Sequence, residues 1–177
     1  MADTQLAADL RRAIRDVPDF PKPGILFRDI TGVLADHALL GRAIEAMAAP
    51  FFDGSVTHVA AIESRGFILG APVALALGAG FIPLRKPGKL PSAVERVEYA
   101  LEYGTDALEV LRGAIGDGHR VLIVDDVLAT GGTAKAACDL VRRTGAALAG
   151  CSFLLEIGAL GGREPLKETS VRSLVAV

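Results

Sequence analysis

One strand–loop–helix unit constrains the fold of this 177-residue chain more than any other segment. Residues 120–124 read as an apolar strand, and two adjacent carboxylates, Asp125 and Asp126, end it. A loop with two glycines then leads into a helical pattern over residues 133–144. The unit predicts a buried strand that delivers polar side chains to the start of a helix.

Strands and helices alternate along most of the chain. The strands are expected at residues 57–62, 81–84, 120–124, 151–157 and 171–177, and the helices at residues 4–15, 37–49, 67–77 and 133–144. This alternation is typical of the α/β class, with a central, mostly parallel sheet and helices on both faces. Ligands of such sheets bind beyond the carboxyl ends of the strands, so the loops after Ile62, Leu84 and Val124 should converge on one crevice.

Two segments depart from this alternation. Residues 25–30 form a short extended segment, which a stiff, proline-rich loop precedes. Residues 92–109 alternate polar and apolar side chains around a turn at residues 104–106, which predicts a protruding hairpin. We therefore expect a single domain over residues 1–177 from which this hairpin projects.

Composition and charge argue against several classes of protein. The net charge is −2, with acidic and basic residues mixed along the whole length, so no basic arm points to nucleic acid. The first 15 residues show helical spacing, without the basic start and continuous apolar stretch of a signal peptide. The longest apolar stretch, residues 71–79, is far too short to span a bilayer. We expect a cytoplasmic protein without nucleic-acid or membrane partners.

The cysteines and histidines form no recognisable site in the sequence. Cys138 and Cys151 lack metal-ligand spacing and lie in apolar surroundings, which predicts two buried, reduced thiols. His37, His58 and His119 are scattered singly, so each is expected to be structural or solvated.

The loop after the two carboxylates has the composition of an anion-binding site. Its residues 129–133 read Ala-Thr-Gly-Gly-Thr. Glycines let backbone N–H groups approach an anion closely, and the following helix N-terminus adds a partial positive charge. With hydroxyl donors from Thr130 and Thr133, this loop can hold a phosphate without any lysine.

The surrounding sequence narrows the choice of ligand. No Walker motif is present and no G-x-G-x-x-G follows a predicted strand, which argues against nucleotide triphosphatases and dinucleotide-binding proteins. Ionised carboxylates only accept hydrogen bonds, so Asp125 and Asp126 would repel a polyphosphate but suit hydroxyl groups. A sugar monophosphate with free hydroxyls satisfies both halves of the motif. Taken alone, such a pair is also compatible with a plain turn and helix cap.

The run from Asp125 to Thr133, D-D-V-L-A-T-G-G-T, resembles the phosphoribosyl pyrophosphate signature of the type I phosphoribosyltransferases. Four further segments resemble the adenine-specific branch of that family: residues 20–31, 63–67, 85–91 and 101–104. The resemblance implies that adenine displaces pyrophosphate from phosphoribosyl pyrophosphate to give AMP, and that Mg²⁺ is held mainly by the substrate rather than directly by the protein. It also implies a homodimer, and a base-binding hood formed by residues 1–35.

The resemblance further implies roles around the sugar. Asp125 and Asp126 would accept hydrogen bonds from the ribose hydroxyls and face the positive charge that develops on the sugar. The 5'-phosphate would be held by Ala129, Thr130, Gly131, Gly132 and Thr133. Cations stabilise the growing charge of a leaving pyrophosphate, and the family pattern gives this role to Arg65, Lys86 and Lys89. Arg65 thus counts with the two aspartates among the catalytic residues.

The resemblance also implies which two segments bind the purine base and handle its proton. Leu26, Phe27 and Arg28 match the base pocket, where backbone groups would recognise the amino edge of adenine. Glu102 matches a carboxylate on the hairpin that handles the proton on the imidazole side of the purine, and Tyr103 would help the hairpin close as a lid.

Two other functions remain open at this stage. A transferase for hypoxanthine, guanine or xanthine would share the phosphate motif and differ in the base pocket. A non-catalytic regulator that binds nucleic acid could keep the same fold, but it would need a basic surface or an additional module. The net charge of −2 disfavours the regulator.

Overall fold

The computed structural model describes residues 4–100 and 104–177. A five-stranded sheet with the order β4-β3-β7-β8-β9 forms its centre, and every neighbouring pair in it is parallel. The strands are β3 (His58–Ile62), β4 (Gly80–Leu84), β7 (Arg120–Leu128), β8 (Ala147–Glu156) and β9 (Val171–Ala176). The expected α/β class with a parallel sheet is confirmed.

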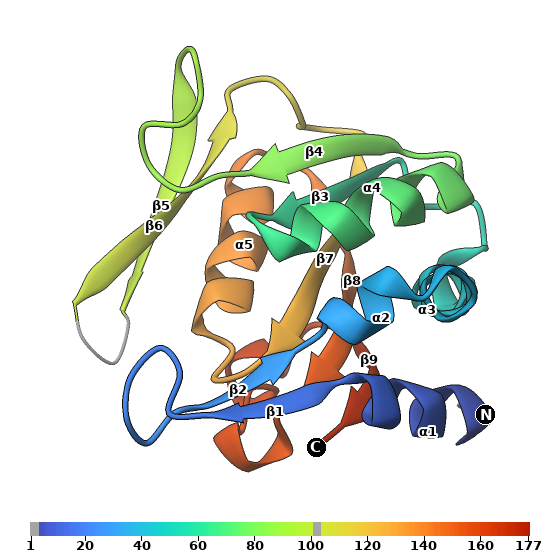
Figure 1. The fold of residues 1–177 in the computed structure, drawn as a ribbon. Helices are drawn as coiled ribbons and strands as arrows, with labels where there is room; N and C mark the ends of the chain where they lie inside the picture. Colours follow the sequence, from blue (N-terminus) through green and yellow to red (C-terminus); the bar gives the residue numbers. More distant parts are fainter. Residues whose placement is uncertain (1–3, 101–103) are drawn as a thin grey trace.

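Helices cover both faces of this sheet (Figure 1). One face packs against α1 (Thr4–Ala13), α3 (His37–Ala48) and α4 (Arg65–Leu77), and the other against α5 (Gly132–Arg143). Successive residues of a strand point to opposite faces, so Val59 and Leu122 belong to the first core while Ala60 and Ile123 belong to the second. Strands buried on both faces account for the continuous apolar runs in the sequence.

Short helical turns complete the framework. They are α2 (Thr31–Ala35) and three 3₁₀ turns, η1 (Ala49–Phe51), η2 (Gly158–Leu160) and η3 (Glu164–Leu166). No helix within residues 4–100 and 104–177 is both long and apolar enough to cross a membrane.

Two antiparallel ribbons lie beside the central sheet. The first joins β1 (Arg15–Pro18) to β2 (Leu26–Asp29), and the second, the expected hairpin, joins β5 (Val94–Ala100) to β6 (Thr105–Leu111). The hairpin packs against α5 and extends away from the sheet (Figure 1). The predicted turn at residues 104–106 was wrong in part, because Thr105 already pairs with Ala100.

The predicted helix over residues 4–15 was too long. It ends at Ala13, because the next residues pair with β2 in the first ribbon. Arg15 Nη2 donates to Asp29 Oδ2 at 2.8 Å, and Val17 lies opposite Phe27. Cross-strand pairing overrides the helical spacing there.

The predicted end of the central strand at the carboxylate pair was also wrong. β7 continues through Asp125 and Asp126 to Leu128. Its pairing with β3 stops at Val124, whereas its pairing with β8 continues to Leu128. Among the described residues, no strand pairs with the last four residues of β7 on the β3 side, and that side opens into a cleft.

The cysteines behave as expected, and two histidines meet. Cys138 and Cys151 are free and buried, with their sulfur atoms 3.6 Å apart.

The rings of His58 and His119 lie 4.4 Å apart at the amino ends of β3 and β7, at the opposite edge of the sheet from the cleft. Burial, and then the neighbouring His119, lower the pKa of His58.

Leu154, fully buried in β8, tests the packing of this core. Replacing it with Ala should lower the free energy of unfolding by about 2–5 kcal/mol, because the cavity cannot fully collapse. Leu154→Met keeps most of the volume and should cost less than about 1.5 kcal/mol. Guanidinium unfolding followed by circular dichroism measures both. An Ala variant as stable as the Met variant would contradict this packing.

Candidate active site

A cleft of about 890 Å³ lies beyond the carboxyl ends of β3 and β7. Its walls come from separate segments of the chain: residues 24–28, 62–65, Lys86, 125–134, Ile157 and Leu160. The loops that follow β3, β4 and β7 all contribute, as the strand order predicts.

The loop of residues 129–133 forms one wall and leads into α5. Gly131 caps this helix with a φ of +84°, a conformation that side chains disfavour. A Cβ on Gly131 would also lie 2.3 Å from the carbonyl oxygen of Gly162. The loop is thus packed closely against Gly162, and the N–H groups of the first turn of α5 are available to an anion.

Asp125 and Asp126 occupy the part of β7 that extends beyond β3. Asp126 is only 5% exposed, and its Oδ2 lies 2.6 Å from Nε of Arg65, the first residue of α4. Asp125 Oδ1 accepts a hydrogen bond from the Asp126 N–H at 2.9 Å. Gly66 makes room for this arrangement, because a Cβ there would lie 2.7 Å from Asp125 Oδ1.

Folding disfavours the charged form of Asp125. Burial raises its pKa well above its usual range, and the adjacent Asp126 carboxylate adds to the rise. The N–H of Asp126 and the positive charge of Arg65 oppose this rise in pKa but do not cancel it. A hydroxyl-bearing ligand that donates to Asp125 would stabilise its charged form.

The first ribbon supplies the next wall of the cleft. Leu26 is 45% exposed, and Leu26, Phe27 and Arg28 all line the cavity. The Arg65 guanidinium lies 5.0 Å from the centre of the Phe27 ring, so the predicted base-binding segment sits beside the predicted sugar site. Arg28 forms an ion pair with Asp16 of β1, which ties β2 to its partner strand.

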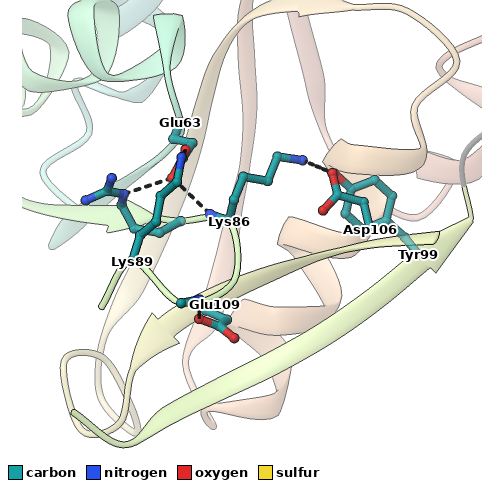
Figure 2. Close-up of polar contacts among 8 residues, drawn as sticks. Glu63, Lys86, Lys89, Tyr99, Asp106 and Glu109 are labelled. Carbon is teal, nitrogen blue, oxygen red and sulfur yellow. Dashed lines mark hydrogen bonds and ion pairs between the residues drawn. The ribbon is translucent and has the colours of Figure 1, made fainter. Parts of the chain in front are cut away.

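The loop after β4 holds the other predicted cations, but they face different ways (Figure 2). Lys86 lines the cleft, whereas Lys89 forms an ion pair with Glu63 and does not line it. Glu63 also accepts from Arg85 Nε at 2.8 Å and from the Lys86 N–H at 2.9 Å. Burial alone would raise the pKa of Glu63, but these donors lower it to about 2.

Sequence reasoning missed several residues around this site. Glu63 was noted only within a motif, and Tyr99 and Asp106, which contact Lys86, were assigned no role. The lysine ammonium is only partly exposed and therefore needs polar partners, which the hairpin provides. Leu160, 47% exposed and lining the cleft, follows a strand end in a glycine-rich loop, a signal too common to single out.

Some predicted features lie beyond these observations. Glu102 and Tyr103 fall outside the described residues. Within residues 4–100 and 104–177, no three His, Cys, Asp or Glu side chains are grouped closely enough to cage a metal ion.

Comparisons with known proteins agree with this geometry. The sequence profile of the phosphoribosyl transferase domain matches residues 31–174. An adenine phosphoribosyltransferase of Myxococcus xanthus is 58% identical, with 99% of this chain and 95% of that protein covered. The crystal structure of adenine phosphoribosyltransferase from Rhodothermus marinus superposes with a TM-score of 0.95 at 50% identity, covering 99% of this chain and all of that one.

A third similar protein has been solved with ligands. The Saccharomyces cerevisiae adenine phosphoribosyltransferase, complexed with an imino-altritol bisphosphate and adenine, gives a TM-score of 0.90 at 38% identity. The alignment covers 96% of this chain and 98% of that one.

Asp125→Asn tests the electrostatic strain in the cleft. The pKa of Asp125 is raised by folding, so the penalty for its charge is absent below the unfolded carboxyl pKa of about 3.9 and grows as the pH rises above it. The variant should therefore melt at a higher temperature than the parent at pH 8, and the difference should shrink towards pH 4.5.

Asp139→Asn is the matched control for this measurement. Asp139 forms ion pairs with Lys135 and Arg142 along α5, so its loss should leave the melting temperature unchanged or slightly lower. Thermal melts followed by circular dichroism across the pH range give both results. A lower melting temperature for Asp125→Asn than for the parent at pH 8 would contradict the claim that the charge of Asp125 destabilises the fold.

Proposed function

The chain belongs to the phosphoribosyltransferase family, and from that premise we propose how its cleft transfers the phosphoribosyl group of phosphoribosyl pyrophosphate to adenine. The products of this purine-salvage reaction are AMP and pyrophosphate. The observation that carries the proposal is that the N-terminus of α5, two carboxylates and Arg65 line one cleft. Only a ligand with both phosphates and hydroxyls suits that combination.

The sugar and its 5'-phosphate occupy the wall formed by β7 and α5. The N–H groups and hydroxyls of residues 129–133 hold the phosphate at the positive end of α5. Asp125 and Asp126 accept from the ribose hydroxyls, and their charge stabilises the cationic character that develops at the anomeric carbon.

The pyrophosphate leaves on the side of the cationic residues. The bond from the anomeric carbon to the pyrophosphate oxygen breaks as the bond to the purine nitrogen forms. Arg65 and Lys86 line the cleft there, and Lys89 lies on the same loop as Lys86. Removing one such charge-stabilising donor typically costs about 2.7–4 kcal/mol of transition-state stabilisation.

Mg²⁺ accompanies the substrate in this proposal. It prefers oxygen ligands and binds through one or two carboxylates together with substrate phosphates. In this proposal the pyrophosphate and ribose hydroxyls supply most of its ligands, because within the described residues no three acidic side chains are grouped closely enough to cage the ion. When bound, the ion neutralises charge on the leaving pyrophosphate.

Adenine lies against β2, in the hood formed by residues 1–35. Among the described residues β2 pairs only with β1, so backbone groups on its other edge are available to a ligand. A carbonyl of this segment that accepts from the amino group of adenine would face a second acceptor in a 6-oxo purine. Such an unpaired arrangement in a buried site strongly disfavours the wrong base.

In this proposal the hairpin accepts the proton that adenine loses and also closes over the site. The purine loses a proton from its imidazole nitrogen as the new bond forms, and Glu102 takes it in this proposal, with Tyr103 closing the site. The support is the family likeness together with the position of β5 and β6 beside Lys86.

Incubation with Mg²⁺ and phosphoribosyl pyrophosphate tests the reaction and its base. With adenine, hypoxanthine, guanine and xanthine offered in parallel, AMP should be the dominant product. The Asp125→Asn and Asp126→Asn double variant should lose at least about a hundredfold in rate, because the charge opposite the sugar is gone. Another dominant monophosphate would contradict the base site, and a double variant with the parent rate would contradict the sugar site.

We also propose that the chain works as a homodimer in the cytoplasm. Ile68 and Leu75 lie on one exposed face of α4, and Phe81 is exposed on the neighbouring edge strand β4. Two free, buried thiols 3.6 Å apart fit a reducing compartment.

Sedimentation equilibrium tests the pairing. We expect a mass of twice the 18.4 kDa chain, and Leu75→Lys should shift the population towards the single chain, because it places a charge on the apolar face. A parent protein that sediments as one chain at micromolar concentration would contradict the homodimer.

A further inference from the structure

Lys86 lines the cleft, and its ammonium is bound to the hairpin (Figure 2). Tyr99 Oη of β5 lies 2.6 Å from Lys86 Nζ, and the Asp106 carboxylate of β6 forms an ion pair with the same nitrogen. Tyr99 and Asp106 are direct cross-strand partners, and the tyrosine hydroxyl donates to Asp106 Oδ2 at 3.3 Å. The three side chains form one connected cluster.

This cluster is partly shielded from water, which strengthens it. The side chains of Lys86 and Asp106 are 30% and 26% exposed. Burial alone would lower the pKa of Lys86, but the bonds to Asp106 and Tyr99 outweigh it and raise the pKa. Lys86 is therefore fully charged at neutral pH, and its charge is largely neutralised by Asp106.

The backbone of the same loop is held separately. The Lys86 N–H donates to Glu63 at 2.9 Å, and the Gly88 N–H donates to Glu109 Oε2 at 3.1 Å. Arg85 and Glu109 exchange two backbone hydrogen bonds of 2.9 and 2.8 Å. The flexible side chain of Lys86 can thus change its partner without any movement of the loop that carries it.

We propose that Asp106, assisted by Tyr99, is a positioning residue that competes with pyrophosphate for Lys86. Without pyrophosphate the ammonium is held by Asp106, and with pyrophosphate it transfers to a phosphate oxygen. Part of the binding energy is then used to break the pair with Asp106, so the carboxylate weakens pyrophosphate binding and favours its release. This inference rests on the proposed role of Lys86 at the pyrophosphate.

Asp106→Asn removes the competing charge and keeps the size of the side chain. Isothermal titration calorimetry of the full-length Asp106→Asn variant with inorganic pyrophosphate and Mg²⁺ should give binding about threefold to tenfold tighter than that of the parent. Tyr99→Phe keeps the ring but removes the hydroxyl, so it should tighten binding less, in the same direction. In steady state, the KM for phosphoribosyl pyrophosphate should fall for Asp106→Asn while that for adenine stays unchanged.

Glu98→Gln is the matched control for the loss of a negative charge on the hairpin. Glu98 is exposed on β5 and bonds to Arg96, so its variant should bind pyrophosphate within twofold of the parent. A similar gain for Glu98→Gln would mean that charge alone, rather than the contact with Lys86, sets the affinity, and this would overturn the proposal.

A double-mutant cycle with Lys86→Ala separates this inference from the function on which it rests. Lys86→Ala should weaken pyrophosphate binding, and adding Asp106→Asn to it should change nothing further. If Lys86→Ala binds pyrophosphate as tightly as the parent does, Lys86 does not bind pyrophosphate. The proposed competition by Asp106 is then wrong as well. If Lys86→Ala weakens binding but Asp106→Asn and Tyr99→Phe fail to tighten it, only the competition is wrong.

Discussion

The cleft depends on the difference in length between two neighbouring strands. β7 pairs with β3 only as far as Val124 and then continues along β8 to Leu128. Beyond that point no described strand pairs with the β3 side of β7, and Asp125 and Asp126 lie in the wall of the cavity. The same geometry lets the first turn of α4 approach β7, which only a glycine at position 66 permits. Carboxylates, Arg65 and the start of α5 therefore meet at one place.

Positive and negative side chains around the cleft are paired with one another. Each cation assigned to the pyrophosphate already contacts a carboxylate: Arg65 with Asp126, Lys86 with Asp106, and Lys89 with Glu63. The ligand-free protein thus compensates much of the charge that a substrate would otherwise meet. In the proposed reaction, substrate binding would be an exchange of partners, in which phosphate oxygens replace carboxylates and ribose hydroxyls approach the freed acids. Such an exchange would select a ligand with both groups and would keep the product from binding too tightly.

Local sequence signals predicted the parallel sheet and the glycine-rich turn into α5 well. The apolar run at residues 120–124 and the glycine at position 131 act through short-range physics, namely burial on two faces and positive φ at a helix start. The end of β7 was mispredicted because a carboxylate pair normally ends a strand, and only pairing with β8 sustains it here. Partners distant in sequence, such as Tyr99 and Asp106 for Lys86, depend on how the hairpin packs, which no local pattern encodes. The contact of His58 with His119 was missed for the same reason.

A crystal structure of the protein with AMP and Mg²⁺-pyrophosphate is the most direct measurement of how the cleft works. We expect the 5'-phosphate oxygens on the N–H groups of residues 129–133 and the ribose hydroxyls on Asp125 and Asp126. The adenine should lie against Leu26 to Arg28, where these residues line the cavity. A phosphate bound away from the start of α5, or a ribose turned from both carboxylates, would contradict the account.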